Sequence, residues 1–424
     1  MSHLYITDLD GTLLNDSTEV SPESAAIISD LSARGALITV ATARTPATVE
    51  KLLCDTDIRI PAIVMTGASM WDRQKRRYVN PRLISPDKAS SAIEVFIRNG
   101  LQPFVYTISG ELLEVFHHGP LTPEEQTFVD LRKDLDLKKF YLDSTERRVR
   151  EAENVILIFG MGNEPQLGEI ARKLEDEGGY SISFYEDNAS PQYYIEVFAE
   201  GVSKASAVTS LASRVGADGI TVYGDNLNDL SMMAVADDSV AVSNAKPEVL
   251  AQASRSIGSN NSDAVAKDMK EQFEKTAPVV SVLIITYNQH DTISRAIDSV
   301  LEQETDYPYE ILIGDDGSTD GTRRICEEYA SRYPNLIRLM PEAPNKGMLR
   351  NYFDTLAAAR GKYIADCAGD DCWCDPRKID MMTEILEKNP DVTAVFSDAR
   401  LVYESDPSRN VTTDSNPSVA RWRD

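Results

Sequence analysis

The order of apolar and helical segments predicts an α/β protein built on parallel sheets. A short apolar run ends at Asp8, a helical pattern follows Pro22, and further apolar runs cover 36–41 and 60–65. Strands that alternate with helices usually pair in parallel and carry helices on both faces of the sheet. A second series of the same kind starts at Val279. We therefore expect one such sheet in each part of the chain.

The first helix has clear signals at both ends. Ser21 is a typical N-cap, Pro22 fits the first helical position, and Gly35 ends the helix. Apolar residues recur between these signals at helical spacing: Ala25, Ile28 and Leu31. This helix is therefore expected to pack against the strands on either side of it.

The regular alternation of predicted strands and helices is interrupted between residues 83 and 190. A β-hairpin is predicted for 102–108 and 112–118, joined through Ser109-Gly110, and a helical stretch follows Pro123. Two further strands are expected at 154–159 and 180–185, and the parallel pattern is expected to resume at Tyr193. We therefore predict an α+β unit over 83–190, inserted into a core formed by 1–82 and 191–272.

A polar stretch without clear periodicity follows the core, and we interpret 273–278 as a linker. The second series, 279–424, contains five predicted strands with helices between them: 280–286, 310–314, 337–340, 363–365 and 392–396. This βα order again indicates a parallel sheet.

Composition limits the classes of partner. The chain has 424 residues, enough for two or three domains, and a net charge of −25. Such acidity repels nucleic acids and anionic lipids, so neither is an expected partner. No apolar run approaches the roughly 18 residues of a membrane span, and the first strand starts too early for a secretory signal. The five cysteines are few and odd in number, and no secretory signal is expected, so we predict reduced thiols and a cytoplasmic protein.

Polar side chains follow the strands of the first series. Asp8 and Asp10 follow the first strand, Thr42 follows the second, Asp225 follows a later one, and Lys204 lies near a helix start. The carboxyl ends of parallel strands form the ligand crevice of an open α/β sheet. We therefore expect these side chains to form a single site.

These residue types suit phosphoryl transfer through a covalent aspartyl phosphate. Asp8 would attack phosphorus, while Lys204 and Thr42 would neutralise and hydrogen-bond the phosphoryl oxygens. Asp8 and Asp225 offer hard oxygen ligands to Mg²⁺, which would offset the repulsion between carboxylate and phosphate. Asp10 would protonate the leaving oxygen and then activate water.

The segment 1–272 resembles the haloacid dehalogenase superfamily phosphatases, and the insertion resembles the cap of the Cof-like subgroup, which sets substrate specificity. The resemblance implies a Rossmann-like core in which Asp229 orients metal-bound water. It implies a Mg²⁺ site at Asp8, Asp10, Asp225 and Asp229, and phosphate or substrate contacts at Gly11, Thr12, Arg44, Asn228 and Asn244. The sequence departs from the subgroup at Ala43, which is usually Gly, and at Thr66, which is often Asn.

The second series also delivers polar residues to one edge of its predicted sheet: Thr286 and Tyr287, Asp315 and Asp316, and Asp370 and Asp371. Acidic pairs at strand ends favour a nucleoside diphosphate held through a divalent metal. Residues 279–403 resemble the family 2 glycosyltransferases of the GT-A fold. The resemblance implies that these residues and Arg350 bind a nucleotide sugar with Mg²⁺ or Mn²⁺.

Two departures affect the transferase prediction. Ala368 stands where the family has the first acidic residue of its metal-binding element, so that contact is missing or supplied by Asp371. The family's acceptor base lies on a later segment, and nothing after Tyr403 offers it. We therefore expect 279–424 to be a partial domain that is inactive or incomplete for transfer.

The leading functional prediction is a Mg²⁺-dependent phosphatase for a small phosphorylated metabolite, with a sugar phosphate suggested only by the second domain. Two alternatives stay open. The chain could be primarily a glycosyltransferase with an accessory phosphatase, or a non-catalytic module that binds phosphorylated ligands. A calcium loop over 8–19 is disfavoured, because Leu13 occupies the glycine position and a strand precedes the loop.

Overall fold

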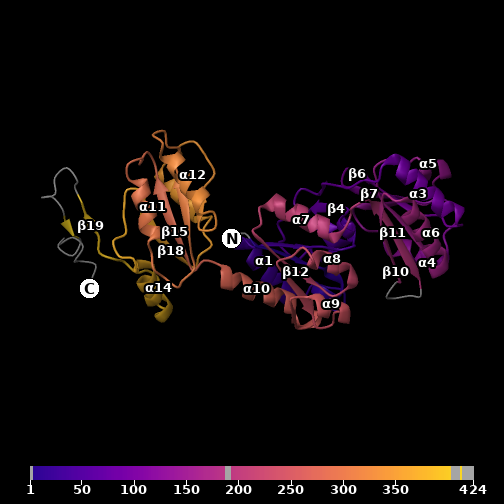
Figure 1. Cartoon of the computed structure of the whole chain (residues 1–424), viewed down its shortest axis with the longest axis horizontal. Coiled ribbons are helices and arrows are strands. Elements are labelled where there is room, and N and C mark those ends of the chain that lie inside the picture. Colours follow the sequence, from indigo (N-terminus) through magenta and orange to yellow (C-terminus); the bar gives the residue numbers. More distant parts are fainter. Residues whose placement is uncertain (1–2, 187–191, 403–410, 413–424) are drawn as a thin grey trace. The chain divides into compact units, whose positions relative to one another are not determined.

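The computed structural model describes residues 3–186, 192–402 and 411–412. The chain forms two compact units, which divide between Lys275 and Thr276 (Figure 1). This division falls within the predicted linker. Within the described ranges, no helix has the length and apolar character that crossing a bilayer requires.

The core of the first unit is a parallel sheet of five strands in the order β14-β13-β12-β1-β2. Its strands are β1 His3–Thr7, β2 Leu37–Val40, β12 Gly219–Gly224, β13 Asp238–Val242 and β14 Arg255–Ile257. The end of β1 is in register with both neighbours, because Thr7 pairs with Tyr223 of β12 and with Val40 of β2. The polar residues that follow these three strands are therefore brought to one edge.

Helices and short helical turns connect these strands. The helices are α1 Pro22–Ala33, α2 Pro46–Leu52, α7 Lys204–Val215, α8 Leu230–Met233, α9 Pro247–Gln252 and α10 Ala264–Thr276. The single turns are Leu9–Leu13, Met65–Gly67, Leu227–Asp229 and Asn260–Ser262. The predicted signals of α1 are confirmed, because the Ser21 hydroxyl accepts a hydrogen bond from the Ser24 N–H at 3.0 Å and Pro22 is the first helical residue.

The strand predicted at 60–65 forms, but it joins the core sheet only weakly. β3 Ala62–Val64 pairs antiparallel with β4 Ser69–Asp72, which pairs with β5 Arg77–Val79. A single parallel bridge, Ala41 to Ile63, links it to the end of β2. Met65 and Thr66 have positive φ angles of 49° and 55°, and this tight turn sends the chain back alongside β3.

The insertion is a six-stranded sheet in the order β10-β11-β9-β6-β7-β8, covered by helices. Its strands are β6 Phe104–Ser109, β7 Leu112–Phe116, β8 Lys138–Tyr141, β9 Val155–Gly162, β10 Tyr180–Glu186 and β11 Tyr193–Ala199, and its helices are α3 Pro86–Arg98, α4 Pro123–Asp130, α5 Glu146–Arg150 and α6 Glu164–Glu177. The predicted hairpin is confirmed, because Ser109 pairs with Leu112 across its turn.

The prediction that the parallel core resumes at Tyr193 is wrong. β11 runs antiparallel to both β10 and β9, so it belongs to the sheet of the insertion. Ile195 and Val197 pack into the core of the insertion, while Glu196 lies between them in sequence and points to the other face. Glu196 and Phe198 on that other face are buried as well, so both faces of β11 are covered, and the parallel core resumes only at α7.

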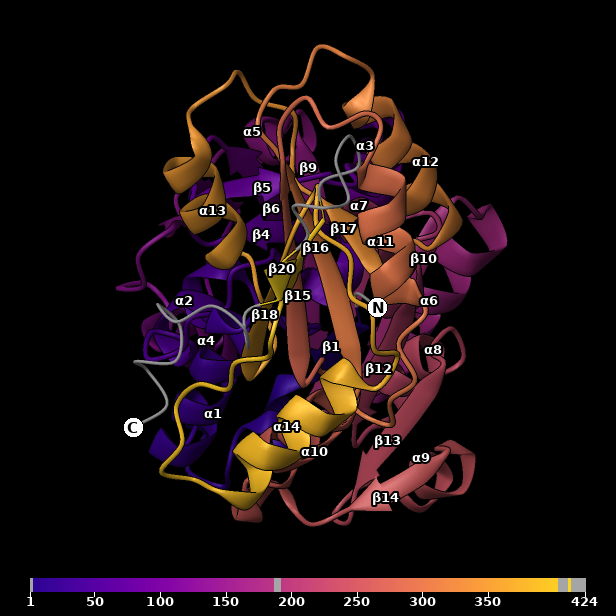
Figure 2. The same cartoon turned by 90° about the vertical axis from the view of Figure 1, so that its left-hand side faces the viewer.

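The second unit contains a parallel sheet in the order β17-β16-β15-β18. Its strands are β15 Val280–Thr286, β16 Tyr309–Asp315, β17 Ile337–Leu339 and β18 Tyr363–Ala368, and its helices are α11 Ile293–Leu301, α12 Thr322–Arg332, α13 Met348–Leu356 and α14 Lys378–Lys388. A short pair, β19 Arg400–Leu401 and β20 Val411–Thr412, lies outside this sheet. Figure 2 shows α13 on one side of the sheet and α11 with α12 on the other.

The prediction of a strand at 392–396 is wrong, because these residues have no regular secondary structure. Phe396 is 90% exposed and Val392 is 38% exposed. An apolar alternation becomes a strand only where a neighbour accepts its backbone hydrogen bonds and a second layer covers one of its faces. The alternation by itself was therefore insufficient evidence for a strand.

The tight turn after β3 generates a prediction about stability. Gly67 has a φ of +94°, and a Cβ at this position would lie 2.2 Å from the carbonyl oxygen of Ser203, the N-cap of α7. Gly110 also has a positive φ, +62°, but a Cβ there would meet no atom within 4 Å. We expect Gly67→Ala to lower the free energy of unfolding by about 1–3 kcal/mol more than Gly110→Ala, as overpacking does. Urea unfolding of the full chain measures both, and equal losses would contradict the close approach.

Candidate active site

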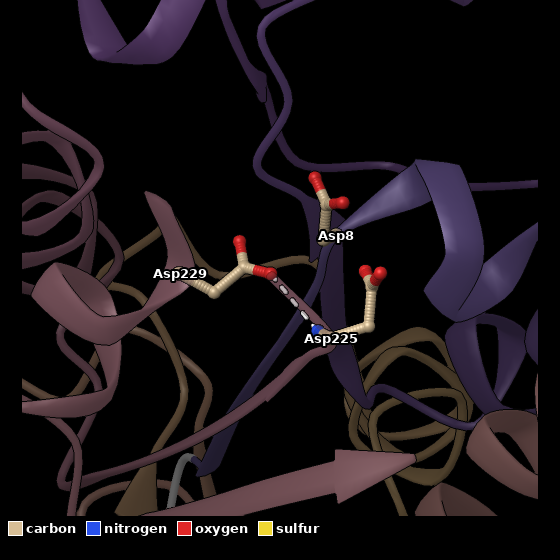
Figure 3. A group of neighbouring side chains, drawn as sticks. All are labelled: Asp8, Asp225 and Asp229. Atoms are coloured by element: carbon tan, nitrogen blue, oxygen red, sulfur yellow. Dashed lines mark hydrogen bonds between the residues drawn. The ribbon is translucent and has the colours of Figure 1, made fainter. Parts of the chain in front are cut away.

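Three carboxylates meet at the edge of the core sheet (Figure 3). Asp8 follows β1, Asp225 follows β12, and Asp229 ends the turn that precedes α8. One carboxylate oxygen from each residue lies within 4.8 Å of the others. Asp229 is held by its own loop, because its Oδ2 accepts hydrogen bonds at 3.0 Å from the backbone N–H groups of Asp225 and Asn226.

Lys204 supplies the positive charge of this cluster. It is the first residue of α7 and is buried, with 1% of its surface exposed. Its Nζ donates hydrogen bonds at 2.7 Å both to Asp8 Oδ1 and to Asp229 Oδ1. Burial alone would lower the pKa of Lys204, but the charges of Asp229 and Asp8 raise it overall, so the side chain is an ammonium ion.

The cluster contains more carboxylates than cations. Burial raises the pKa of Asp8 above its usual range, although Lys204 acts in the opposite direction. Burial also raises the pKa of Asp225 to about 6, and the hydrogen bond from Thr12 opposes that rise. One ammonium cannot balance three clustered carboxylates, so the site favours a further cation. Three carboxylate oxygens, two from residues that follow strands and one from the turn before α8, fit the hard ligand set of Mg²⁺.

The turn after β1 is fitted closely around Asp225. The Thr12 hydroxyl donates a hydrogen bond to Asp225 Oδ1 at 2.7 Å. Gly11 has a φ of +75°, and a Cβ there would lie 2.5 Å from Asp225 Oδ2. The Asn244 amide donates to the carbonyl oxygen of Gly11 at 2.7 Å. Gly11, Thr12 and Asn244 therefore shape the loop around the carboxylates.

Asp10 lies apart from the three clustered carboxylates. The Nε and Nη2 groups of Arg44 donate to its two oxygens at 2.7 and 2.6 Å, so the pair is bidentate. Thr42 is buried, and its hydroxyl oxygen accepts a hydrogen bond from the Arg44 N–H at 3.1 Å, which leaves the hydroxyl hydrogen available to a ligand. Asn228 is exposed, and its carbonyl oxygen accepts a bond from the Ser231 hydroxyl.

Sequence reasoning missed Asn260. Its side-chain amide donates to the carbonyl oxygen of Leu14 at 3.0 Å, and its backbone N–H donates to Asn244 Oδ1 at 3.0 Å. Asn260 thus connects the loop after β1 with Asn244. No motif or spacing links residues 246 positions apart, so the sequence carried no signal for this contact.

A cavity of about 790 Å³ lies at the carboxyl ends of β15 and β18 in the second unit. Four predicted residues line it: Thr286, Tyr287, Asp316 and Asp370. Asp316 is buried, and its carboxylate accepts hydrogen bonds from the backbone N–H groups of Lys346 and Gly347 at 2.8 and 2.9 Å. These bonds tie the loop before α13 to the end of β16.

The other predicted residues of this unit lie outside the cavity lining. Asp315 is buried and accepts hydrogen bonds from Ser318, Arg350 pairs with Asp354 at 3.0 Å, and the Asp371 N–H donates to the carbonyl oxygen of Ala368.

Asp366 lines the cavity instead, together with Tyr352, and neither residue was predicted from the sequence. Asp366 lies two residues before Ala368 on the same face of β18. It therefore places a carboxylate in the cavity close to the position where Ala368 offers none. The period-two alternation of a strand was the signal that could have found it.

Comparisons with known proteins agree with the division of the chain into two units. Residues 5–269 match the haloacid dehalogenase-like hydrolases, and residues 281–415 match glycosyl transferase family 2. An uncharacterized protein of Mycobacterium tuberculosis is 44% identical over 125 residues, which are 30% of this chain and 36% of that protein. The chain thus spans about a third of the length of the curated relatives it matches first.

Other relatives match the first unit. The pyridoxal phosphate phosphatase YbhA of Escherichia coli is 24% identical over 274 residues, covering 61% of this chain and 94% of that protein. A solved haloacid dehalogenase-like hydrolase from Bacteroides thetaiotaomicron has a TM-score of 0.54 and 20% identity, covering 64% of this chain and all of that one. With its family match, fold and acidic site in agreement, the chain belongs to the haloacid dehalogenase-like hydrolases, and its residues 281–415 are similar to glycosyl transferase family 2.

Proposed function

We propose that the first unit hydrolyses phosphomonoesters through an aspartyl phosphate on Asp8, with Mg²⁺ as its cofactor. The observation that carries this proposal is the burial of Asp8 against Lys204, beside Asp225 and Asp229. Lys204 contacts Asp8 Oδ1, so we assign the attack to Oδ2. Asp8, Asp225 and Asp229 would hold Mg²⁺ directly or through water. When bound, Mg²⁺ would supply positive charge that lowers the repulsion between nucleophile and phosphate.

The chain's own residues account for each bond and proton. Asp8 Oδ2 forms a bond to phosphorus while the bond from phosphorus to the leaving oxygen breaks, and Asp10 gives that oxygen a proton. Asp10 then takes a proton from the water that attacks the acyl phosphate, which releases inorganic phosphate and restores the Asp8 carboxylate. Lys204 and the Thr42 hydroxyl stabilise the charge on the phosphoryl oxygens.

We propose a small phosphorylated metabolite as the substrate. A sugar phosphate is supported only by the glycosyl transferase segment in the same chain, which is an argument from association. YbhA, a relative whose match has about the length of the first unit, is named for pyridoxal phosphate. A sugar phosphate and pyridoxal phosphate share only a phosphate group, so we propose that the site recognises this group. The insertion of residues 83–199 would select the rest of the molecule.

A second function is supported by the cavity of the second unit. We propose that it binds a nucleoside-diphosphate sugar with Mg²⁺ or Mn²⁺. Asp316 and Asp370 place two carboxylates in a cavity at the carboxyl ends of parallel strands, where α/β sheets bind nucleotides. Leu283, Ile285 and Tyr352 give its wall an apolar surface for the flat base. The proposal is limited to binding of the donor.

The nucleophile is tested by replacing Asp8. We expect the chain with Mg²⁺ to release phosphate from p-nitrophenyl phosphate, and Asp8→Asn to abolish release because an amide oxygen is a poor nucleophile. Asp55 is an exposed aspartate outside the carboxylate cluster, so Asp55→Asn is the matched control and should keep full activity.

Borohydride added during turnover should reduce the acyl phosphate and leave homoserine at position 8, which peptide mass spectrometry detects. Full activity in Asp8→Asn would disprove the assignment. If the first unit only binds phosphorylated ligands, neither the wild type nor Asp8→Asn would release phosphate from p-nitrophenyl phosphate.

Metal binding should depend on pH. Burial raises the pKa of Asp225 to about 6. Without metal, this carboxyl contributes stability below its ordinary pKa of 3.8, and the contribution is lost as the pH rises through about 6. Mg²⁺ has to displace the same proton, so it should bind more tightly above that pH.

We therefore expect Mg²⁺ to raise the melting temperature of the first unit at about pH 8 and to change it little at about pH 5. Differential scanning calorimetry with Mg²⁺ or with a chelator measures the difference. Asp225→Asn should lose the increment, while Asp55→Asn should retain it. An equal increment at both pH values would contradict the role of Asp225.

The second unit offers a matched pair of neighbouring carboxylates. Asp370 lines the cavity, whereas Asp371 does not. We expect Asp370→Asn to weaken the binding of uridine or guanosine diphosphate with Mn²⁺ roughly tenfold or more, since a hydrogen bond or contact to a charged group contributes about 1.5–3 kcal/mol. Asp371→Asn should change the dissociation constant much less. Isothermal titration calorimetry compares the two variants, and the reverse ranking would show that Asp371 carries the contact.

A further inference from the structure

The side chains of Arg44 and Asp10 form an ion pair with two parallel hydrogen bonds. Nε and Nη2 of Arg44 reach the two different oxygens of Asp10 at 2.7 and 2.6 Å. Such a fork fixes the plane of a carboxylate as well as its position. The Asp10 side chain is 52% exposed and that of Arg44 is 28% exposed, so the more buried partner holds the more exposed one.

The backbone of Arg44 is itself anchored. Its N–H donates to the Thr42 hydroxyl oxygen at 3.1 Å, and its carbonyl oxygen accepts from the Met65 N–H at 3.0 Å. The Thr66 N–H donates to the carbonyl oxygen of Thr42 at 3.0 Å. Three hydrogen bonds thus fix the segment from which the guanidinium extends. Asp10, by contrast, is followed directly by Gly11, whose φ is +75°.

We propose that Arg44 is a positioning residue, which aims the carboxyl group of Asp10 at the bond that breaks, and is not a ligand of the substrate phosphate. This inference rests on the proposed function, because it gives Asp10 the proton transfers of that reaction. It differs from the role that the family resemblance implies for Arg44, which is a substrate contact.

The placement of charge supports this division of work. Lys204, in contact with Asp8, already provides a cation beside the nucleophile. The guanidinium of Arg44 is directed at Asp10, and the hydrogen bond to Asp10 is the largest cause of the raised pKa of Arg44. A half-exposed aspartate without this partner would sample several rotamers in water. Transfer of a proton requires a donor within hydrogen-bond reach of the leaving oxygen, so this sampling would slow the reaction.

If Arg44 only orients the carboxyl group of Asp10, its removal should lower the turnover number and have little effect on substrate binding. We expect Arg44→Ala to lower kcat about 10- to 100-fold, the range of a misplaced acid–base group, and to leave KM nearly unchanged. Arg44→Lys keeps the charge but cannot form the fork, so it should remain impaired. Arg59→Ala removes another arginine that contacts an aspartate, Asp57, away from the site, and should behave as the wild type.

The leaving group separates positioning from a structural effect. p-Nitrophenolate leaves readily without a proton, whereas the phenolate of phenyl phosphate needs one more. We expect the loss of kcat/KM in Arg44→Ala to be several times larger for phenyl phosphate than for p-nitrophenyl phosphate. Added guanidinium ion at non-denaturing concentration should restore part of the phenyl phosphate activity of Arg44→Ala, and none of that of Asp10→Asn.

Three results would overturn the inference. A raised KM with unchanged kcat would make Arg44 a substrate ligand. Equal losses for both esters would remove the link to the proton on the leaving group. Rescue of Asp10→Asn by guanidinium would show an action that bypasses Asp10. The proposed phosphatase function fails separately, since it depends on whether Asp8→Asn abolishes phosphate release.

Discussion

The buried ammonium of Lys204 is the interaction on which the first unit depends. It lies between Asp8 and Asp229 at 2.7 Å from each, with almost no exposure to water. A buried charge without partners is strongly destabilising, so these three side chains must be placed together. That requirement fixes the start of α7 against the ends of β1 and β12, and Gly67 permits the close approach at Ser203.

The same arrangement leaves the site with more negative than positive charge. Asp8 and Asp225 both have raised pKa values because burial removes water that would stabilise their anions. The proposed divalent cation would supply the positive charge that this site lacks, and it would thereby lower the repulsion that a phosphate meets there. The match of residues 5–269 to the haloacid dehalogenase-like hydrolases is consistent with this distribution of charge.

Both units place their polar residues by one rule of parallel sheets, yet the two sites differ in character. In the first, short hydrogen bonds hold the carboxylates against Lys204 and Thr12. In the second, the carboxylates of Asp366 and Asp370 line an open cavity with apolar walls. A tightly paired cluster suits a nucleophile that must be held still, and an open cavity suits the reversible binding of a larger ligand.

The features that depend on neighbours along the chain could be predicted from the amino-acid sequence. These include the cap of α1, the hairpin at Ser109-Gly110, and the acidic residues after β1 and β12, because turns, caps and strand ends are local. Tertiary structure alone decided the sheet to which β11 belongs, the absence of a strand at 392–396, the pairing of Arg44 with Asp10, and the contacts of Asn260. Those outcomes depend on which distant segment supplies a hydrogen-bond partner or a covering layer, and neither spacing nor periodicity within one segment encodes that choice.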